Sequence, residues 1–126
     1  MVEHTVKAYD KELDTLGHRI AEMGGIAEKM VTDAMDALAN ADSALAHQVV
    51  ETDLRLDVLQ REIEDFAVMT IARRQPVAID LRELIGAIRV AGDLERVGDL
   101  AKNIAKRSVK MASNLAFPAP SSTSST

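Results

Sequence analysis

Apolar and small residues recur every three or four positions along three long segments of the chain, with polar and charged residues between them. Two segments cover about residues 6–38 and 43–73, and the third runs from between Pro76 and Asp80 to about Met111. Alternating steps of three and four place side chains on one face of an α-helix. Each segment therefore predicts one amphipathic helix.

Leu, Ile, Met and Ala dominate the faces that we expect to be buried. Two glycines, Gly24 and Gly25, interrupt the first segment without changing the phase of its pattern, which predicts close backbone packing or a slight bend rather than a break. The predicted face of the first helix consists of Tyr9, Leu13, Leu16, Ile20, Met23, Ala27, Met30, Ala34 and Leu38. That of the second consists of Leu45, Val49, Thr52, Leu56, Leu59, Ile63, Phe66 and Thr70.

Capping residues separate the three segments. Asn40 can end the first helix, and Asp42 can cap the second by accepting a backbone N–H bond. Pro76 breaks the second helix because it has no N–H and restricts the preceding residue. Asp80 and Glu83 have the spacing of a capping box at the start of the third helix.

Short connections between long helices favour antiparallel neighbours, so we predict an all-α fold, an elongated up-down-up three-helix bundle. A coiled-coil oligomer is the alternative, because such regular stripes also pack between chains. The bundle is expected to occupy residues 1–112, with Ser113 and Asn114 marking the end of its last helix. Residues 113–126 are rich in Ser, Thr and Pro and predict a disordered tail.

Composition and charge narrow the function classes. Aromatic residues make up 2% of the 126 residues, which disfavours an all-β fold, and the absence of Cys excludes disulfides, Cys-ligated zinc and thiol catalysis. No segment approaches the length of an apolar membrane span, and the polar stretch from Met1 to Tyr9 does not resemble a signal peptide. Residues 1–65 carry a net charge of −9 and residues 66–126 a net charge of +4. The acidic half argues against nucleic acid as a partner and indicates either two differently charged faces or charge pairing between helices.

Oxygen-bearing side chains replace part of the apolar pattern in the second and third segments. Glu95, Asp99 and Asn103 lie four residues apart and stack on one face of the third helix, and Asp53 and Asp57 do so at the edge of the second. Carboxylate and amide oxygens suit Mg²⁺, Ca²⁺ and Mn²⁺, and carboxylates also hold iron. These five residues are candidate metal ligands.

A solvated face with ion pairs is the competing interpretation, for instance Asp99 with Lys102, or Asp53 with a basic group of the third helix. His47 is either a surface residue or the phosphoacceptor of a phosphotransfer bundle. Arg73 and Arg74 either meet an anion or complement the carboxyl end of the second helix. Neither a Gly-rich phosphate loop nor a nucleophile elbow occurs, so the sequence does not indicate an enzyme.

Two motifs together resemble the PhoU family of phosphate-specific transport system accessory proteins, which regulate phosphate uptake. The first reads Q-P-x-x-x-D-L-R over residues 75–82, and the second reads L-E-R-x-G-D over residues 94–99, with Asn103 and Ile104 following. Met23 to Gly25 and Asp53 also resemble the first repeat of that family. The resemblance covers about residues 8–112.

The resemblance implies a cytoplasmic, non-enzymatic protein that restrains phosphate uptake and the phosphate-starvation response. It implies contact with the ATPase subunit of the phosphate ABC transporter and with the phosphate-sensing histidine kinase, without insertion into the membrane. Some members hold metal ions on E/D-x-x-x-D motifs, which fall here on Asp53 with Asp57 and on Glu95 with Asp99; Asn103 extends the second pair. Mn, Mg, Fe and Zn are not distinguished.

Members of this family usually carry two copies of the bundle, whereas this sequence contains one. Two chains are therefore expected to pair as a homodimer that restores the missing contact. A structural or dimerisation bundle without metal is the main alternative function, and a histidine phosphotransfer bundle using His47 is the minor one.

Overall fold

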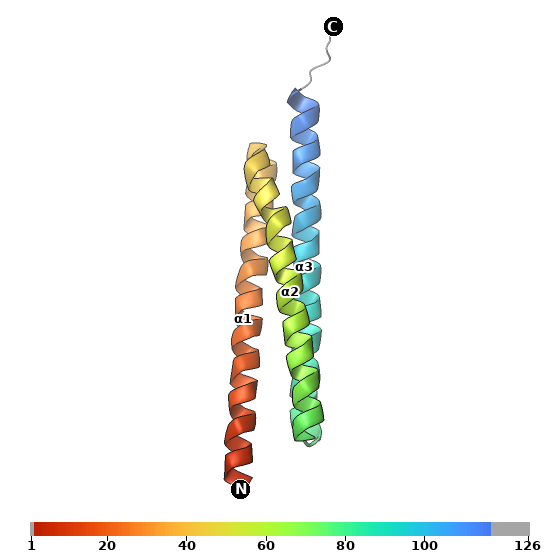
Figure 1. The fold of residues 1–126 in the computed structure, drawn as a ribbon. Coiled ribbons are helices and arrows are strands. Elements are labelled where there is room, and N and C mark those ends of the chain that lie inside the picture. Colours follow the sequence, from red (N-terminus) through yellow and green to blue (C-terminus); the bar gives the residue numbers. More distant parts are fainter. Residues whose placement is uncertain (1, 117–126) are drawn as a thin grey trace.

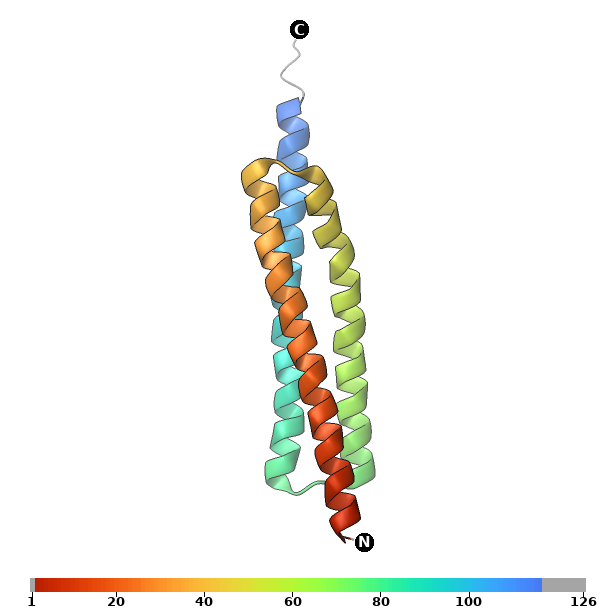
Figure 2. The ribbon, with the colours of Figure 1, turned by 90° about the vertical axis from the view of Figure 1, so that its left-hand side faces the viewer.

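Three long antiparallel helices make up the fold of the computed structural model, which describes residues 2–116, with side chains described for residues 9–114 (Figure 1). They are α1 (Val2–Asn40), α2 (Ser43–Arg74) and α3 (Ala78–Ala116). The two connections lie at opposite ends of the bundle (Figure 2). The all-α, up-down-up three-helix bundle is confirmed.

The helix junctions use the chemistry that the sequence predicted for α2. The Leu45 N–H donates to Asp42 Oδ1 at 3.1 Å, so Asp42 is the N-cap. Gln75 takes the left-handed conformation (φ 46°), and its N–H donates to the carbonyl of Ile71 to close the helix. Pro76 follows and cannot continue the helix.

The ends of α3 differ from prediction. The helix begins at Ala78, and the Leu81 N–H already donates to the carbonyl of Val77, so Asp80 lies inside the first turn and the capping box is wrong. At the other end, Ser113 and Asn114 lie within the helix, because each lowers helix propensity by only about half a kcal/mol. Residues 117–126, which hold most of the predicted tail, lie outside the described residues.

Small side chains let the three helices approach closely. Half of the buried apolar residues are alanines, and the largest fully buried side chains include Met23, Met30, Leu56 and Ile63. Near the α1–α2 turn, Ala37 is buried while the predicted core residue Leu38 is exposed. The predicted face of α2 is likewise shifted by one residue at three places, where Ala46, Asp53 and Ala67 take the buried positions instead of Leu45, Thr52 and Phe66.

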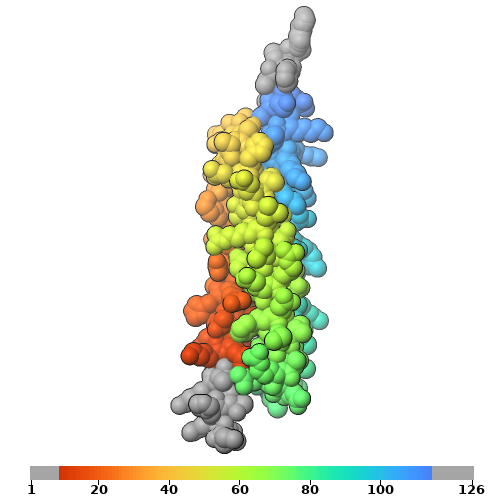
Figure 3. All heavy atoms as spheres, in the orientation of Figure 1, coloured from red at the N-terminus to blue at the C-terminus, as the bar shows by residue number. Residues whose placement is uncertain are grey.

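Gly24 and Gly25 lie in an unbroken stretch of α1. A Cβ atom added at either would meet nothing within 4 Å, so the prediction that they permit close packing is wrong. None of the helices over the described residues is long and apolar enough to span a bilayer. On the face shown in Figure 3, α2 covers the front of the molecule and is flanked by α1 and α3.

Candidate carboxylate site between α2 and α3

Asp53 occupies a position in the core of the bundle. Asp53 is only 3% exposed, although the helical pattern predicted it at the edge of the apolar face. Its Oδ2 lies 3.2 Å from the Nζ of Lys102 on α3, whereas its Oδ1 is buried and has no hydrogen-bond partner among the side chains of residues 9–114. An unpartnered buried carboxylate oxygen is costly and requires an explanation.

Gly98 explains how α3 can pass so close to this carboxylate. A Cβ atom at Gly98 would overlap Cδ2 of Leu56 and would lie 3.5 Å from Asp53 Oδ1 and from the sulfur of Met30. Only glycine leaves room for these side chains. The close approach of α2 and α3 at Gly98 therefore shields Asp53 from water.

Lys102 bridges the buried acid to an exposed one. Its Nζ lies 3.2 Å from Asp99 Oδ1 and 3.2 Å from Asp53 Oδ2. The hydrogen bonds to Asp99 and Asp53 raise the pKa of Lys102 above its usual value. Both ion pairs of the competing interpretation, Asp99 with Lys102 and Asp53 with a base of the third helix, are thus present.

A second pair of carboxyl groups lies alongside, formed by Asp57 and Glu95. The hydrogen bond that protonated Glu95 donates to Asp57, burial, and the negative charges of Asp57, Asp53 and Asp99 together raise the pKa of Glu95 to about 7. With its amide nitrogen turned toward Glu95, Gln60 donates to Oε2 at 2.7 Å and to Oε1 at 3.2 Å. Near neutral pH, Glu95 is therefore only partly ionised.

We call Asp53, Asp57, Glu95 and Asp99 the carboxylate cluster. Four of the five predicted metal ligands belong to it, and Asn103 does not: its side chain is exposed, and no hydrogen bond among the described residues joins it to the cluster. Within residues 9–114, no three His, Asp or Glu side chains are arranged to hold a metal ion. A metal would have to share Asp53 and Asp99 with the ammonium of Lys102 or displace it. Metal binding stays a prediction.

Chemically, the cluster offers the orphan oxygen of Asp53 and two carboxyl groups that share space at Asp57 and Glu95. Such hard oxygen donors suit a divalent cation, which would also relieve the repulsion between them. Sequence reasoning missed Gly98 and the depth of Asp53. A small residue in the middle of the L-E-R-x-G-D motif was the only available signal.

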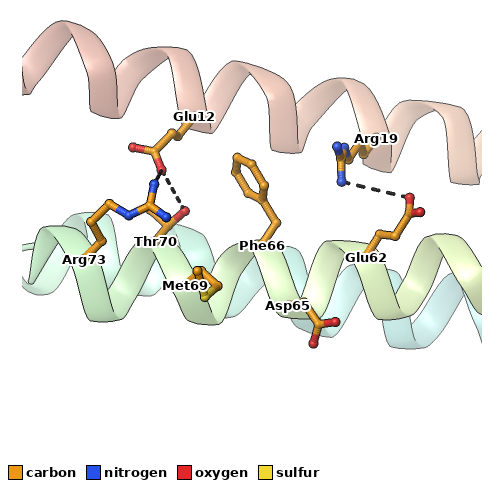
Figure 4. A pocket seen from close by; sticks show the side chains of 8 residues that line it. All are labelled: Glu12, Arg19, Glu62, Asp65, Phe66, Met69, Thr70 and Arg73. Carbon is orange, nitrogen blue, oxygen red and sulfur yellow. Dashed lines mark hydrogen bonds and ion pairs between the residues drawn. The ribbon is translucent and has the colours of Figure 1, made fainter.

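Sequence reasoning also missed a second polar cluster, which lies between α1 and α2 (Figure 4). Glu12 accepts from Arg74 Nε at 2.7 Å and from Thr70 Oγ1 at 3.2 Å, and Arg73 approaches it at 3.9 Å. Glu12 is therefore the anion that Arg73 and Arg74 meet. Further along, Arg19 lies over the Phe66 ring at 5.4 Å.

His47 is a surface residue. It is exposed near the start of α2, and its Nδ1 lies 2.7 Å from the carbonyl oxygen of Ser43 one turn earlier. A phosphoacceptor histidine must also be exposed, so the phosphotransfer alternative stays a prediction.

Comparison with known proteins identifies the family. Residues 20–108 match the PhoU domain. The chain is similar to the phosphate-specific transport system accessory protein PhoU homologs of Rhizobium meliloti (55% identity over 109 residues, 86% of this chain and 46% of the relative) and Caulobacter vibrioides (51% over 109 residues, 86% and 47%). It is also similar to the homolog of Pseudomonas aeruginosa (40% over 111 residues, 88% and 46%). The chain spans about half the length of the curated relatives it matches. With its three-helix bundle and both sequence motifs, this chain belongs to the PhoU family.

Proposed function

We propose that this protein is a non-enzymatic regulator of phosphate uptake that acts in the cytoplasm by contacting the transport machinery. The observation that carries the proposal is the 55% identity to a phosphate-specific transport system accessory protein homolog over 86% of this chain. In this proposal, the bundle docks on the ATPase subunit of the phosphate ABC transporter and on the phosphate-sensing histidine kinase. Docking restrains uptake and the phosphate-starvation response.

Calorimetry tests the contact directly. The purified ATPase subunit is titrated into this protein in EDTA and again in Mn²⁺, and we expect saturable binding. Absence of binding in both conditions would contradict the proposal for this chain. A mixture of the ATPase subunit with an unrelated helical bundle of similar net charge serves as the control for charge-driven association.

We further propose that the carboxylate cluster takes up a divalent cation, for which the orphan Oδ1 of Asp53 is the supporting observation. The proposed ligands are Asp53, Asp57, Glu95 and Asp99. No three of the described His, Asp and Glu side chains converge on one point, so these side chains would have to close around the ion, which would neutralise part of their negative charge. Exchanging Glu95 and Asp99 for Gln and Asn should remove Mn²⁺ binding without changing helicity. Unchanged Mn²⁺ affinity in that double variant would exclude this site.

A matched control keeps the metal test specific. Asp65 lies on α2, is exposed, and forms no ion pair with the cluster among the described residues. Asp65→Asn removes one negative charge, as each cluster substitution does, and should leave Mn²⁺ affinity unchanged. A loss in this control as large as in the cluster variant would show diffuse attraction to an acidic protein rather than a site.

Pairing of two chains as a homodimer is proposed on the exposed apolar residues of α3, among them Val90, Val97 and Leu100. Covering these apolar side chains with a second copy of the chain removes them from water and lowers the free energy of the system. Light scattering at tens of micromolar protein checks this, and a monomeric mass would contradict it.

A further inference from the structure

A hollow of about 450 Å³ on the surface of α3 is lined by two arginines and no acid. Its lining consists of Ala78, Leu81, Arg82, Ile85, Gly86 and Arg89. The floor is apolar or small, and the guanidinium groups belong to residues seven positions apart on the same helix. The hollow is separate from the carboxylate cluster, which begins a turn and a half beyond Arg89 with Glu95.

These two arginines differ from most others in the bundle because they have no carboxylate partner among the side chains described. Arg19, Arg55, Arg73, Arg74 and Arg96 each form an ion pair, whereas Arg82 and Arg89 form none within residues 9–114. The nearby acids are turned elsewhere. Asp80 lines a different hollow with Tyr9, Glu83 lines a groove with Leu13, and Asp93 pairs with Arg96.

Exposed apolar side chains flank the arginines on α3. Ile79 is 73% exposed and Ile85 is 40% exposed, and both lie within one turn of Arg82. Water-exposed aliphatic groups beside guanidinium groups that pair with no acid of residues 9–114 form a surface that is both apolar and positively charged. A ligand for this surface must offer apolar contact and negative charge together.

The spacing of the arginines selects the form of the ligand. Seven residues of helix place their Cα atoms roughly 10.5 Å apart along the axis. A single phosphate or carboxylate reaches both guanidinium groups only if the two long side chains converge on it, whereas two carboxylates with the same seven-residue repeat meet them without convergence. An acidic helix with two glutamates seven residues apart has the same repeat and presents leucines three and four residues after the first glutamate.

We propose that the Arg82–Arg89 hollow is a docking site for an acidic amphipathic helix of a partner protein. The two glutamates of that helix pair with Arg82 and Arg89 in charge-assisted hydrogen bonds, and its apolar residues cover Leu81 and Ile85. A flat anionic membrane would also cover Asp10, Asp80 and Glu83 at the same end of the bundle, whereas a single helix lying along α3 need not.

A designed peptide tests the proposal on the full chain. The probe is a labelled 18-residue helical peptide with Glu at two positions seven apart and Leu three and four residues after the first Glu. Fluorescence anisotropy should show saturable binding that weakens as salt increases. The same peptide with Gln in place of both Glu residues should bind at least about tenfold more weakly.

Charge reversal on the protein supplies the decisive comparison. Arg82→Glu with Arg89→Glu should abolish binding of the Glu peptide and create binding of a matched peptide with Lys at the same two positions. Arg61→Glu is the control, since Arg61 is exposed on α2 and has no ion pair within the described residues. It should leave binding unchanged, and circular dichroism checks that every variant is folded.

Several outcomes would overturn the proposal. Equal loss with Arg61→Glu, or equal binding of the Gln peptide, would show that the hollow does not recognise two carboxylates. Failure of the Glu peptide to bind at low salt would refute it directly. A membrane surface would be identified instead if the protein bound vesicles with 30% anionic lipid through both arginines but did not bind the peptide. A simple anion site would be identified if millimolar inorganic phosphate displaced the peptide.

Discussion

Glu95 makes the stability of this bundle depend on pH near neutrality. Contact with Asp57, burial and the nearby acids raise its pKa from 4.5 to about 7. An acid whose pKa is higher in the folded protein than in the unfolded chain keeps its proton longer when folded. Between pH 4.5 and 7 the folded state therefore binds more protons, and the free energy of unfolding falls as the pH rises.

The magnitude follows from the size of this rise. At about 1.4 kcal/mol per pKa unit, it corresponds to at most about 3 kcal/mol. Glu95 is partly accessible to water, so screening reduces this to about 1–2 kcal/mol. Glu95→Gln replaces the carboxyl group by an amide that stays uncharged at every pH. The variant should match the wild-type protein at pH 5 and be more stable by about 1–2 kcal/mol at pH 8.

Urea unfolding followed by circular dichroism, in EDTA at pH 5, 6, 7 and 8, measures this difference. Glu51→Gln is the matched control, because Glu51 is exposed on α2. Asp57→Asn should also reduce the pH dependence, since it removes the carboxyl group that raises the pKa of Glu95 most. If the difference between Glu95→Gln and the wild-type protein is the same at pH 5 and pH 8, the reasoning is refuted.

Three further predictions concern stability and are measured by urea or thermal unfolding. Lys102→Met leaves the Asp53 carboxylate buried without a cation and should lower the free energy of unfolding by about 2–4 kcal/mol. Adding Asp53→Asn to that variant should restore most of the stability. An unchanged free energy of unfolding in Lys102→Met would mean that water reaches Asp53. Gly98→Ala forces the neighbouring leucine aside and should cost about 1–3 kcal/mol, whereas Gly92→Ala meets open space and should stabilise by up to about 1 kcal/mol. A neutral Gly98→Ala would contradict the close approach of α2 and α3. Asp42→Ala removes the N-cap of α2 and should cost about 1 kcal/mol, and an unchanged melting temperature would contradict that role.

The fold was largely predictable because its signals are local. A repeat of three and four residues defines each helix, and Asp42 and Pro76 act on their own neighbours along the chain. The errors arose where the local signal is weak. Ser113 and Asn114 disfavour helix too little to end it, and the apolar pattern alone does not distinguish Ala37 from Leu38 as the buried residue.

The sequence identified most residues of the site but not how deeply Asp53 is buried. Four-residue spacing identified Asp53, Asp57, Glu95 and Asp99, since it fixes the direction of a side chain around its own helix axis. The distance to the neighbouring helix depends on that helix, and here Gly98 on α3 decides how deeply Asp53 is buried. One chain segment read alone carries no information about that approach.

The carboxylate cluster between α2 and α3 does not maximise the stability of the bundle. An apolar residue of similar volume at Asp53, with another at Lys102, would fill the same space without an orphan oxygen, and such replacements are often neutral or stabilising. Glu95 adds a cost in the free energy of folding that grows above pH 5. Most other buried side chains of α2 and α3 are apolar, many of them alanines, and carry no electrostatic cost. Charges held at a net cost in free energy are most economically explained by something that they bind. A cation that displaces Lys102 would bond Asp53 Oδ2, the oxygen that Lys102 contacts, and its charge would lower the pKa of Glu95. Mn²⁺ should therefore stabilise the protein more at pH 6 after Lys102→Met than before it.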